Sequence, residues 1–334
     1  MTSRRSLVRT IGTAVAGTAT LVGRSLASTA RSGRTATGRS DGTASAPTTL
    51  TVSADRSAVR AAGVPSRLAP VVDALENRID AVSLADVDGL AGTAGVDGSR
   101  LVDGTVVVTG SFDGRALRRE LRQREFTAVG TSGGLARFVS GDGRVAVGAA
   151  RSVLVLGYGP GTGLERVDAA RPTRHAVAAT ARRSSPALGH LDRVLGGNAV
   201  VTADLGAAGR SGSSPIAGEV PAPFAEFVGA ADAAGAAATV RPGRDRVGLR
   251  CALVAEPNRL SVDRVRAAID DVDTGPDSVR VDSLERVGRT IVVDGDAPLE
   301  RLFRASEEAI AGSSTGGERG RQSSAGNARS DESC

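Results

Sequence analysis

The fold of this chain is decided by the stretch TVVVTGSFDG, residues 105–114. Its first five residues, Thr105 to Thr109, are all β-branched and predict a strand. Asp113 comes after the Gly110 turn, in the position of a helix N-cap, and predicts a helix from about Arg115 to Arg124. The region therefore reads as strand, cap and helix in succession.

Toward the C-terminus the pattern changes to short strands separated by turns that contain glycine. They are expected at 126–129, 135–139, 144–148 and 152–156, which indicates successive hairpins. A helix is expected at 164–169, and 175–195 reads as mostly helical with a break near Pro186.

The second half of the chain follows a similar order of elements. Strands are expected at 199–205, 236–240, 246–255, 279–284 and 289–293, and helices at 223–234, 261–272 and 297–310, with an earlier helix at 70–82. We therefore expect an α+β fold of antiparallel sheets with helices packed on one face. The loosely repeated order also suggests two quasi-repeated units, residues 50–196 and 197–311.

The N-terminus has the form of a twin-arginine export signal. Arg4 and Arg5 are followed by Leu7 in the run SRRSLVR, and a mildly apolar segment too short to span a membrane comes next. A small-x-small site predicts cleavage after Ala27, which makes 1–27 the signal peptide. The alternatives are a basic tail of a cytoplasmic protein or a misassigned start. Residues 28–49 and 312–334 are polar and small, and read as a disordered linker and tail.

The composition excludes several kinds of chemistry. The chain contains no lysine, so all 42 basic residues are arginines, and sites that need an amine, such as Walker phosphate loops and Schiff-base enzymes, are ruled out. The formal charge of +5 falls to +1 once the four arginines of the signal are removed, because the signal has no acid. The mature protein is then nearly neutral, which weakens a general attraction to nucleic acid.

One arginine pattern remains a candidate binding site. Arg115, Arg118, Arg119 and Arg122 fall on one face of the helix predicted after Asp113, where they are placed to contact phosphate or lipid headgroups. An ordinary solvated face is the simpler interpretation, because Glu120 and Glu125 interrupt the run and a chain without lysine must use arginine on every solvated helix.

A weak catalytic candidate is the motif GTSGG at 130–134, which matches the serine turn of α/β-hydrolases. Ser132, Asp168 and His175 stand in the hydrolase order. The context argues against the motif, because the residues after Ser132 predict a strand where the hydrolase turn needs a helix. A glycine-rich hairpin loop is the simpler interpretation.

No metal or cofactor is predicted. The two histidines, His175 and His190, are too far apart for a local metal motif, and the two cysteines lack zinc-ligand spacing. Cys251 lies in an apolar run and reads as a small core residue, while Cys334 ends the polar tail.

With the signal, the GSFD turn at 110–113 and the strands at 145–148 and 153–157 in view, the chain resembles uncharacterised secreted proteins of haloarchaea. The resemblance covers mainly residues 1–27 and 100–170. It implies twin-arginine export and an α+β domain, and it brings no activity. The near-neutral mature chain departs from the acidic composition usual in proteins of high-salt cytoplasms.

The sequence therefore predicts an exported protein outside the cytoplasm, with a non-catalytic structural or binding role. The twin-arginine export machinery is the expected partner during translocation, and the sequence identifies no partner of the mature chain. The alternatives are a secreted serine hydrolase that uses Ser132, and a basic nucleic-acid or membrane-surface binder.

Overall fold

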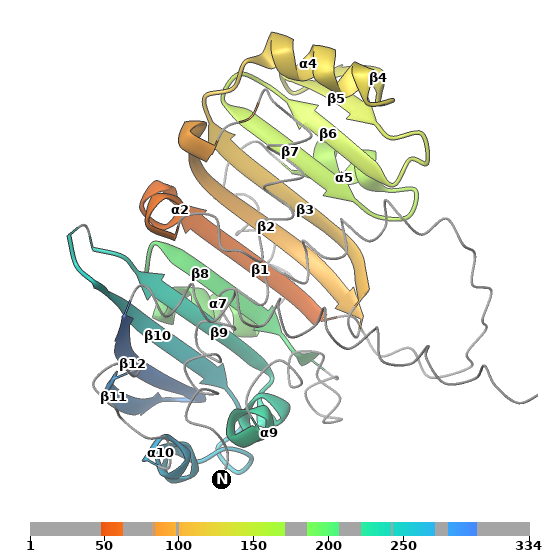
Figure 1. Cartoon of the computed structure of the whole chain (residues 1–334). Coiled ribbons are helices and arrows are strands. Elements are labelled where there is room, and N and C mark those ends of the chain that lie inside the picture. The colour runs from red at the N-terminus through yellow and green to blue at the C-terminus, as the bar shows by residue number, and fades with distance from the viewer. Residues whose placement is uncertain are drawn as a thin grey trace, which may run out of the picture.

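The computed structural model describes residues 48–62, 82, 84–97, 100–170, 186–206, 222–241, 243–270 and 280–298. These residues form one antiparallel sheet of twelve strands with helices packed against it (Figure 1). The strand order is β11-β12-β10-β9-β8-β1-β2-β3-β7-β6-β5-β4, so β1 and β8 lie side by side in the middle. The first seven strands along the chain are β1 (Thr48–Asp55), β2 (Val87–Asp97), β3 (Arg100–Gly110), β4 (Thr127–Ser132), β5 (Leu135–Val139), β6 (Val145–Ala149) and β7 (Val153–Tyr158). The remaining strands are β8 (Ala199–Asp204), β9 (Ala233–Thr239), β10 (Arg246–Val254), β11 (Arg280–Val287) and β12 (Thr290–Pro298).

The helices lie between these strands along the chain. They are α2 (Arg56–Ala62), a 3-10 turn at Leu84–Asp86, α4 (Gly114–Gln123), α5 (Gly163–Ala169), α7 (Pro186–Val194), α9 (Ala222–Ala230) and α10 (Val262–Asp270). Figure 1 shows α5 and α7 behind the strands and α4 at one end of the sheet.

The predicted α+β class, with several antiparallel sheets and helices packed on one face, is wrong. The described chain is mostly strand in one continuous sheet, because β1 pairs with β8 and joins the two expected units. Helices also pack on both faces. Val107 and Val108 are neighbours in β3 and point to opposite faces. Val108 packs with Leu117 of α4, whereas Val107 packs with Val167 of α5.

The same division holds across the whole sheet. Residues paired across antiparallel strands point to the same face, and the pairs connect Val107 through β2 and β1 to Val200 of β8. Val200 packs with α7, so α5 and α7 share one face, called here the α5 face. On the opposite face, called the α4 face, Val228 of α9 packs with Leu50.

The strand, cap and helix predicted at 105–124 are confirmed. The carboxylate of Asp113 accepts hydrogen bonds from the backbone N–H of Arg115 at 2.8 Å and of Ala116 at 3.1 Å, and so caps α4. Glu125, with φ of 64°, ends the helix in the left-handed conformation, and the Phe126 N–H donates to the Leu121 carbonyl at 3.1 Å. The chain therefore turns from the last turn of α4 directly into β4.

The short strands predicted at 126–156 are also confirmed, as β4 to β7. Helix α5 packs closely over β7 because Gly157 has no side chain. A Cβ at Gly157 would lie 2.3 Å from the Gly163 carbonyl oxygen and 2.9 Å from the Cβ of Arg166. Glycine here lets the helix backbone approach the strand.

Asn198 links the ends of three central strands, β1, β8 and β9, beside the β1–β8 pairing. Its side-chain Nδ2 donates to Oδ2 of Asp55 at 2.9 Å, and its Oδ1 accepts the Val240 N–H at 2.7 Å. Its backbone carbonyl accepts the Asp55 N–H at 2.8 Å, and its own N–H donates to the Ala238 carbonyl at 2.8 Å. One residue therefore connects β1 with the strands of the second half.

Several predicted segments lie outside the described residues. At the N-terminus they are the signal, with Arg4, Arg5, Leu7 and Ala27, and the linker up to residue 47. His175 and the C-terminal tail also lie outside. Of the helices expected at 70–82 and 297–310, only Val82 and residues 297–298, which end β12, are described. Among the helices that the structure describes, none is both long enough and apolar enough to cross a membrane.

Candidate functional site: the arginine stripe of α4

The structure places two of the three hydrolase candidates. Ser132 is the last residue of β4, and the Gly133-Gly134 turn after it leads into β5 rather than into a helix. Asp168 lies on α5, where both carboxylate oxygens accept hydrogen bonds from Nη1 of Arg137, at 2.8 and 3.0 Å. His175 is outside the described residues. The carboxylate expected to orient a histidine is therefore paired with an arginine.

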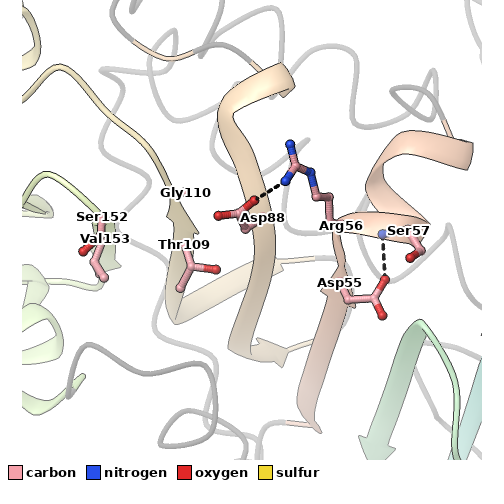
Figure 2. A pocket seen from close by; sticks show the side chains of 8 residues that line it. All are labelled: Asp55, Arg56, Ser57, Asp88, Thr109, Gly110, Ser152 and Val153. Carbon is pink, nitrogen blue, oxygen red and sulfur yellow. Dashed lines mark hydrogen bonds and ion pairs between the residues drawn. The ribbon is translucent and has the colours of Figure 1, made fainter.

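A first hollow opens where the central strands end (Figure 2). It has a volume of about 550 Å³ and is widely open to solvent. Its lining comes from β1, α2, β2, β3 and the start of β7: Asp55, Arg56, Ser57, Asp88, Thr109, Gly110, Ser152 and Val153. The pairing of β1 with β2 and of β3 with β7 brings these distant segments together.

The charged groups of this hollow already have partners within the chain. Oδ1 of Asp55 accepts the N–H groups of Ser57 and Ala58 and so caps α2, while its Oδ2 is held by Asn198. Arg56 forms an ion pair with Asp88 at 3.2 Å, as the dashed line in Figure 2 shows. These contacts assign the hollow a structural role at the strand ends.

The second hollow is lined almost wholly by arginine. Arg115, Arg118, Arg119 and Arg122, with Gln123, line a space of about 450 Å³ on the outer side of α4 that is widely open to solvent. All five side chains are exposed, whereas Leu117 and Leu121 on the inner side are buried in the core. The spacing i, i+3, i+4 and i+7 puts the four guanidinium groups on one face, as the sequence predicted. We call these four residues the arginine stripe.

The charges of the stripe are not neutralised by ion pairs within the described chain. Ten ion pairs are seen in the described residues, and none includes a residue of the stripe. The nearby Glu120 is buried and binds Arg124 at 2.9 Å, on another side of the helix. The stripe therefore presents four adjacent positive charges to solvent.

The electrostatics at the start of α4 agree with this description. The pKa of Asp113 is lowered, first by the hydrogen bonds from the Ala116 and Arg115 N–H groups and then by the charges of Arg119 and Arg115. Asp113 caps the helix through those backbone groups. Its charge also attracts Arg119 and Arg115, but it forms no ion pair with either of them.

Other titratable groups do not gather into a site in the described residues. No three histidine, cysteine or acidic side chains there stand close enough to hold a metal ion. His190 lies partly buried on α7. Cys251 lies in β10 opposite Val293, and burial raises the pKa of its thiol to about 12, so the thiol stays protonated at neutral pH.

The periodicity of the sequence was enough to find the stripe but not the first hollow. Asp55 and Asp88 lie far apart in the chain and meet only because β1 pairs with β2. β2 contains Gly89, Gly92 and Gly95 and has little strand propensity, so it was not predicted. No local signal in the sequence marks that hollow.

Comparisons with known proteins identify no relative. No protein-family model matches the chain, and no curated protein matches it. A solved structure titled "Structure of crystal form I of TP0453" is 12% identical, and the match covers 79% of this chain and 94% of that one with a TM-score of 0.39. A likeness this distant supports no conclusion on fold or function.

Proposed function

We propose that this chain is a non-catalytic binding protein of the extracytoplasmic space that contacts an anionic ligand through the arginine stripe of α4. One observation carries the proposal: four adjacent exposed arginines line one hollow and form no ion pair within the described chain. The export half of the proposal rests on the sequence of residues 1–27.

The geometry favours a ligand with several negative charges. The stripe extends over seven helical steps, or roughly 10 Å at 1.5 Å per residue. Four guanidinium groups along that length exceed what one small anion can neutralise. Each guanidinium has five N–H donors in a planar fork, which suits carboxylate, phosphate and sulfate oxygens.

The alternative is that the stripe is only a solvated helix face. The two interpretations predict different results when two arginines are removed from the stripe and when two are removed elsewhere, although the net charge changes equally. A solvated face contributes to binding no more than any other exposed arginine pair, whereas a binding site loses affinity only when its own arginines are replaced.

Retention on immobilised heparin tests the proposal, with a NaCl gradient for elution. We expect the variant Arg118→Gln with Arg122→Gln to bind about 2- to 30-fold more weakly, since exposed ion pairs contribute about 0.2–1 kcal/mol each. The control is Arg241→Gln with Arg244→Gln, two exposed arginines in the turn before β10, which changes the net charge equally. Equal loss in both variants would contradict a specific site, and no retention of the wild type would contradict anion binding altogether.

Cell fractionation tests the export half separately. The wild-type chain is expected outside the cytoplasm with its mature N-terminus after Ala27, and the variant Arg4→Lys with Arg5→Lys is expected to stay inside. Wild-type chain that stays in the cytoplasm with residues 1–27 attached would contradict export without affecting the heparin result.

A further inference from the structure

We propose that strand β4 and the adjacent arginine stripe form one docking surface, which receives an extended acidic segment of a partner protein as a thirteenth strand. The inference rests on the proposed function for its charge recognition. It adds a second element, the open edge of the sheet, and names the class of partner.

Strand β4 is an exposed edge. It ends the strand order of the sheet, and each of its six residues is exposed. Its sequence TAVGTS contains no charge and no proline, and Val129 is one of two large apolar side chains that the described surface exposes strongly. Exposed edges of this kind accept an added strand, because their outward N–H and C=O groups need partners.

The opposite edge of the sheet differs. Strand β11 has the sequence RVDSLERV, with two arginines, an aspartate and a glutamate among its eight residues. Charged side chains along an edge oppose the approach of another strand. Both edges contain a bulge, between Ala128 and Gly130 in β4 and between Val281 and Ser283 in β11, so the charges are what separates them. The comparison singles out β4.

The stripe and this edge lie at the same end of the molecule. Figure 1 shows α4 and β4 together at one extremity of the sheet. The Glu125 N–H donates to the Arg122 carbonyl at 3.4 Å, so the last arginine of the stripe is one turn from the start of β4. A strand added beside β4 would lie about 4.8 Å away, and every second side chain would point to the α4 face. Acidic residues at those alternate positions would lie on the same side of the sheet as α4 and its stripe.

Charge decides between an acidic partner and a second copy of this chain. Two copies paired edge to edge through β4 would be related by a two-fold axis perpendicular to the sheet, which puts both α4 helices on the same face. Two stripes of four arginines would then approach each other without an anion between them. An extended segment with alternating carboxylates has the opposite charge and avoids this repulsion.

The test uses a labelled peptide of about eight residues in which glutamate alternates with valine or threonine, a usual strand length. Binding to the full mature chain is measured by fluorescence anisotropy at low salt. The control peptides replace glutamate with lysine, or carry N-methyl groups on alternate amides, which removes the donors needed for strand pairing. We expect binding only for the unmodified acidic peptide.

The matched protein variant is Thr131→Pro. Ser132 closes the two-residue turn and so bonds inward to β5, which leaves the Thr131 N–H pointing outward, where proline is tolerated in an edge strand. We expect the peptide to bind this variant about 2- to 13-fold more weakly, the effect of one lost hydrogen bond of about 0.5–1.5 kcal/mol. Heparin retention should be unchanged, which also shows that α4 is still folded.

The outcomes separate the inference from the proposed function. Equal peptide binding by the wild type and Thr131→Pro, or by the N-methylated peptide, would overturn strand addition while leaving the stripe as an anion site. Absence of peptide binding would overturn the inference, and heparin retention would then decide the proposed function alone. A wild-type dimer in sedimentation that Thr131→Pro dissociates would identify a second copy as the occupant and overturn the acidic partner.

Discussion

Replacing Asn198 with alanine tests whether side chains, as well as the strand pairing, hold the ends of the central strands together. The substitution removes the bond from Nδ2 to Oδ2 of Asp55, at 2.9 Å, and the bond from the Val240 N–H to Oδ1, at 2.7 Å. The backbone bonds of residue 198 remain. The experiment therefore isolates the two side-chain contacts.

The expected loss of stability follows from these two bonds. A neutral bond contributes about 0.5–1.5 kcal/mol and a bond to a charged group about 1.5–3 kcal/mol, with the higher values for buried pairs. Asn198 is only partly buried, so we expect about 1.5–3 kcal/mol in all. For a folded region of this size, that lowers Tm by roughly 3–12 °C.

Urea denaturation followed by far-UV circular dichroism measures the change, and fluorescence of Tyr158, the only tyrosine in a chain without tryptophan, gives a second probe. Gln123→Ala is the control, since Gln123 is exposed on α4 and is expected to change stability by less than about 0.5 kcal/mol. A loss below 0.5 kcal/mol for Asn198→Ala would refute the reasoning, because it would mean that water replaces both contacts at no cost.

Three further predictions concern single positions. Glu125→Gly should raise the free energy of unfolding in urea by up to about 1 kcal/mol. The left-handed conformation costs a residue with a side chain about 1–2 kcal/mol, and the larger backbone entropy that glycine loses on folding offsets part of this gain. Gly157→Ala should destabilise it by about 1–3 kcal/mol and lower Tm, since the new Cβ would lie 2.3 Å from the Gly163 carbonyl oxygen; an unchanged melting curve would show that α5 moves away freely. The pKa of Asp113 is lowered, chiefly by the Ala116 N–H, so its contribution is present above the ordinary pKa of 3.8 and is lost as pH falls through the folded value. The difference in stability between wild type and Asp113→Ala should therefore shrink between pH 5 and about pH 2, and a constant difference would contradict the charged cap.

The elements around α4 could be predicted because their signals are local. A β-branched strand, an aspartate cap and glycine turns occur within 105–156, and the structure forms β3, α4 and the β4–β7 hairpins there. The stripe could be predicted for the same reason, since its four arginines repeat with the helical period. Neither prediction required knowledge of distant contacts.

What the sequence did not reveal depends on distant pairing. β1 and β2 were missed because their sequences contain threonine, glycine and alanine rather than a clear apolar run, and they become strands by pairing in the middle of the sheet. The two-faced packing was also missed, although the run Val106-Val107-Val108 is apolar on both sides, which is the pattern of a strand covered on both faces. Contacts between residues that are distant in the sequence decide which strands pair and which faces of the sheet are covered.

The arginine composition itself argues that the stripe differs from the rest of the surface. In a chain without lysine, an exposed arginine carries no information alone, because every basic position must use it. The groups that contact an arginine in the folded chain do indicate its role. Many other arginines of the described chain meet a carboxylate that the fold brings from far away, as Arg137 meets Asp168 and Arg250 meets Asp294. Four adjacent arginines form no such ion pair in the described residues and lie near the edge strand with no charges, which supports the anion site that we propose.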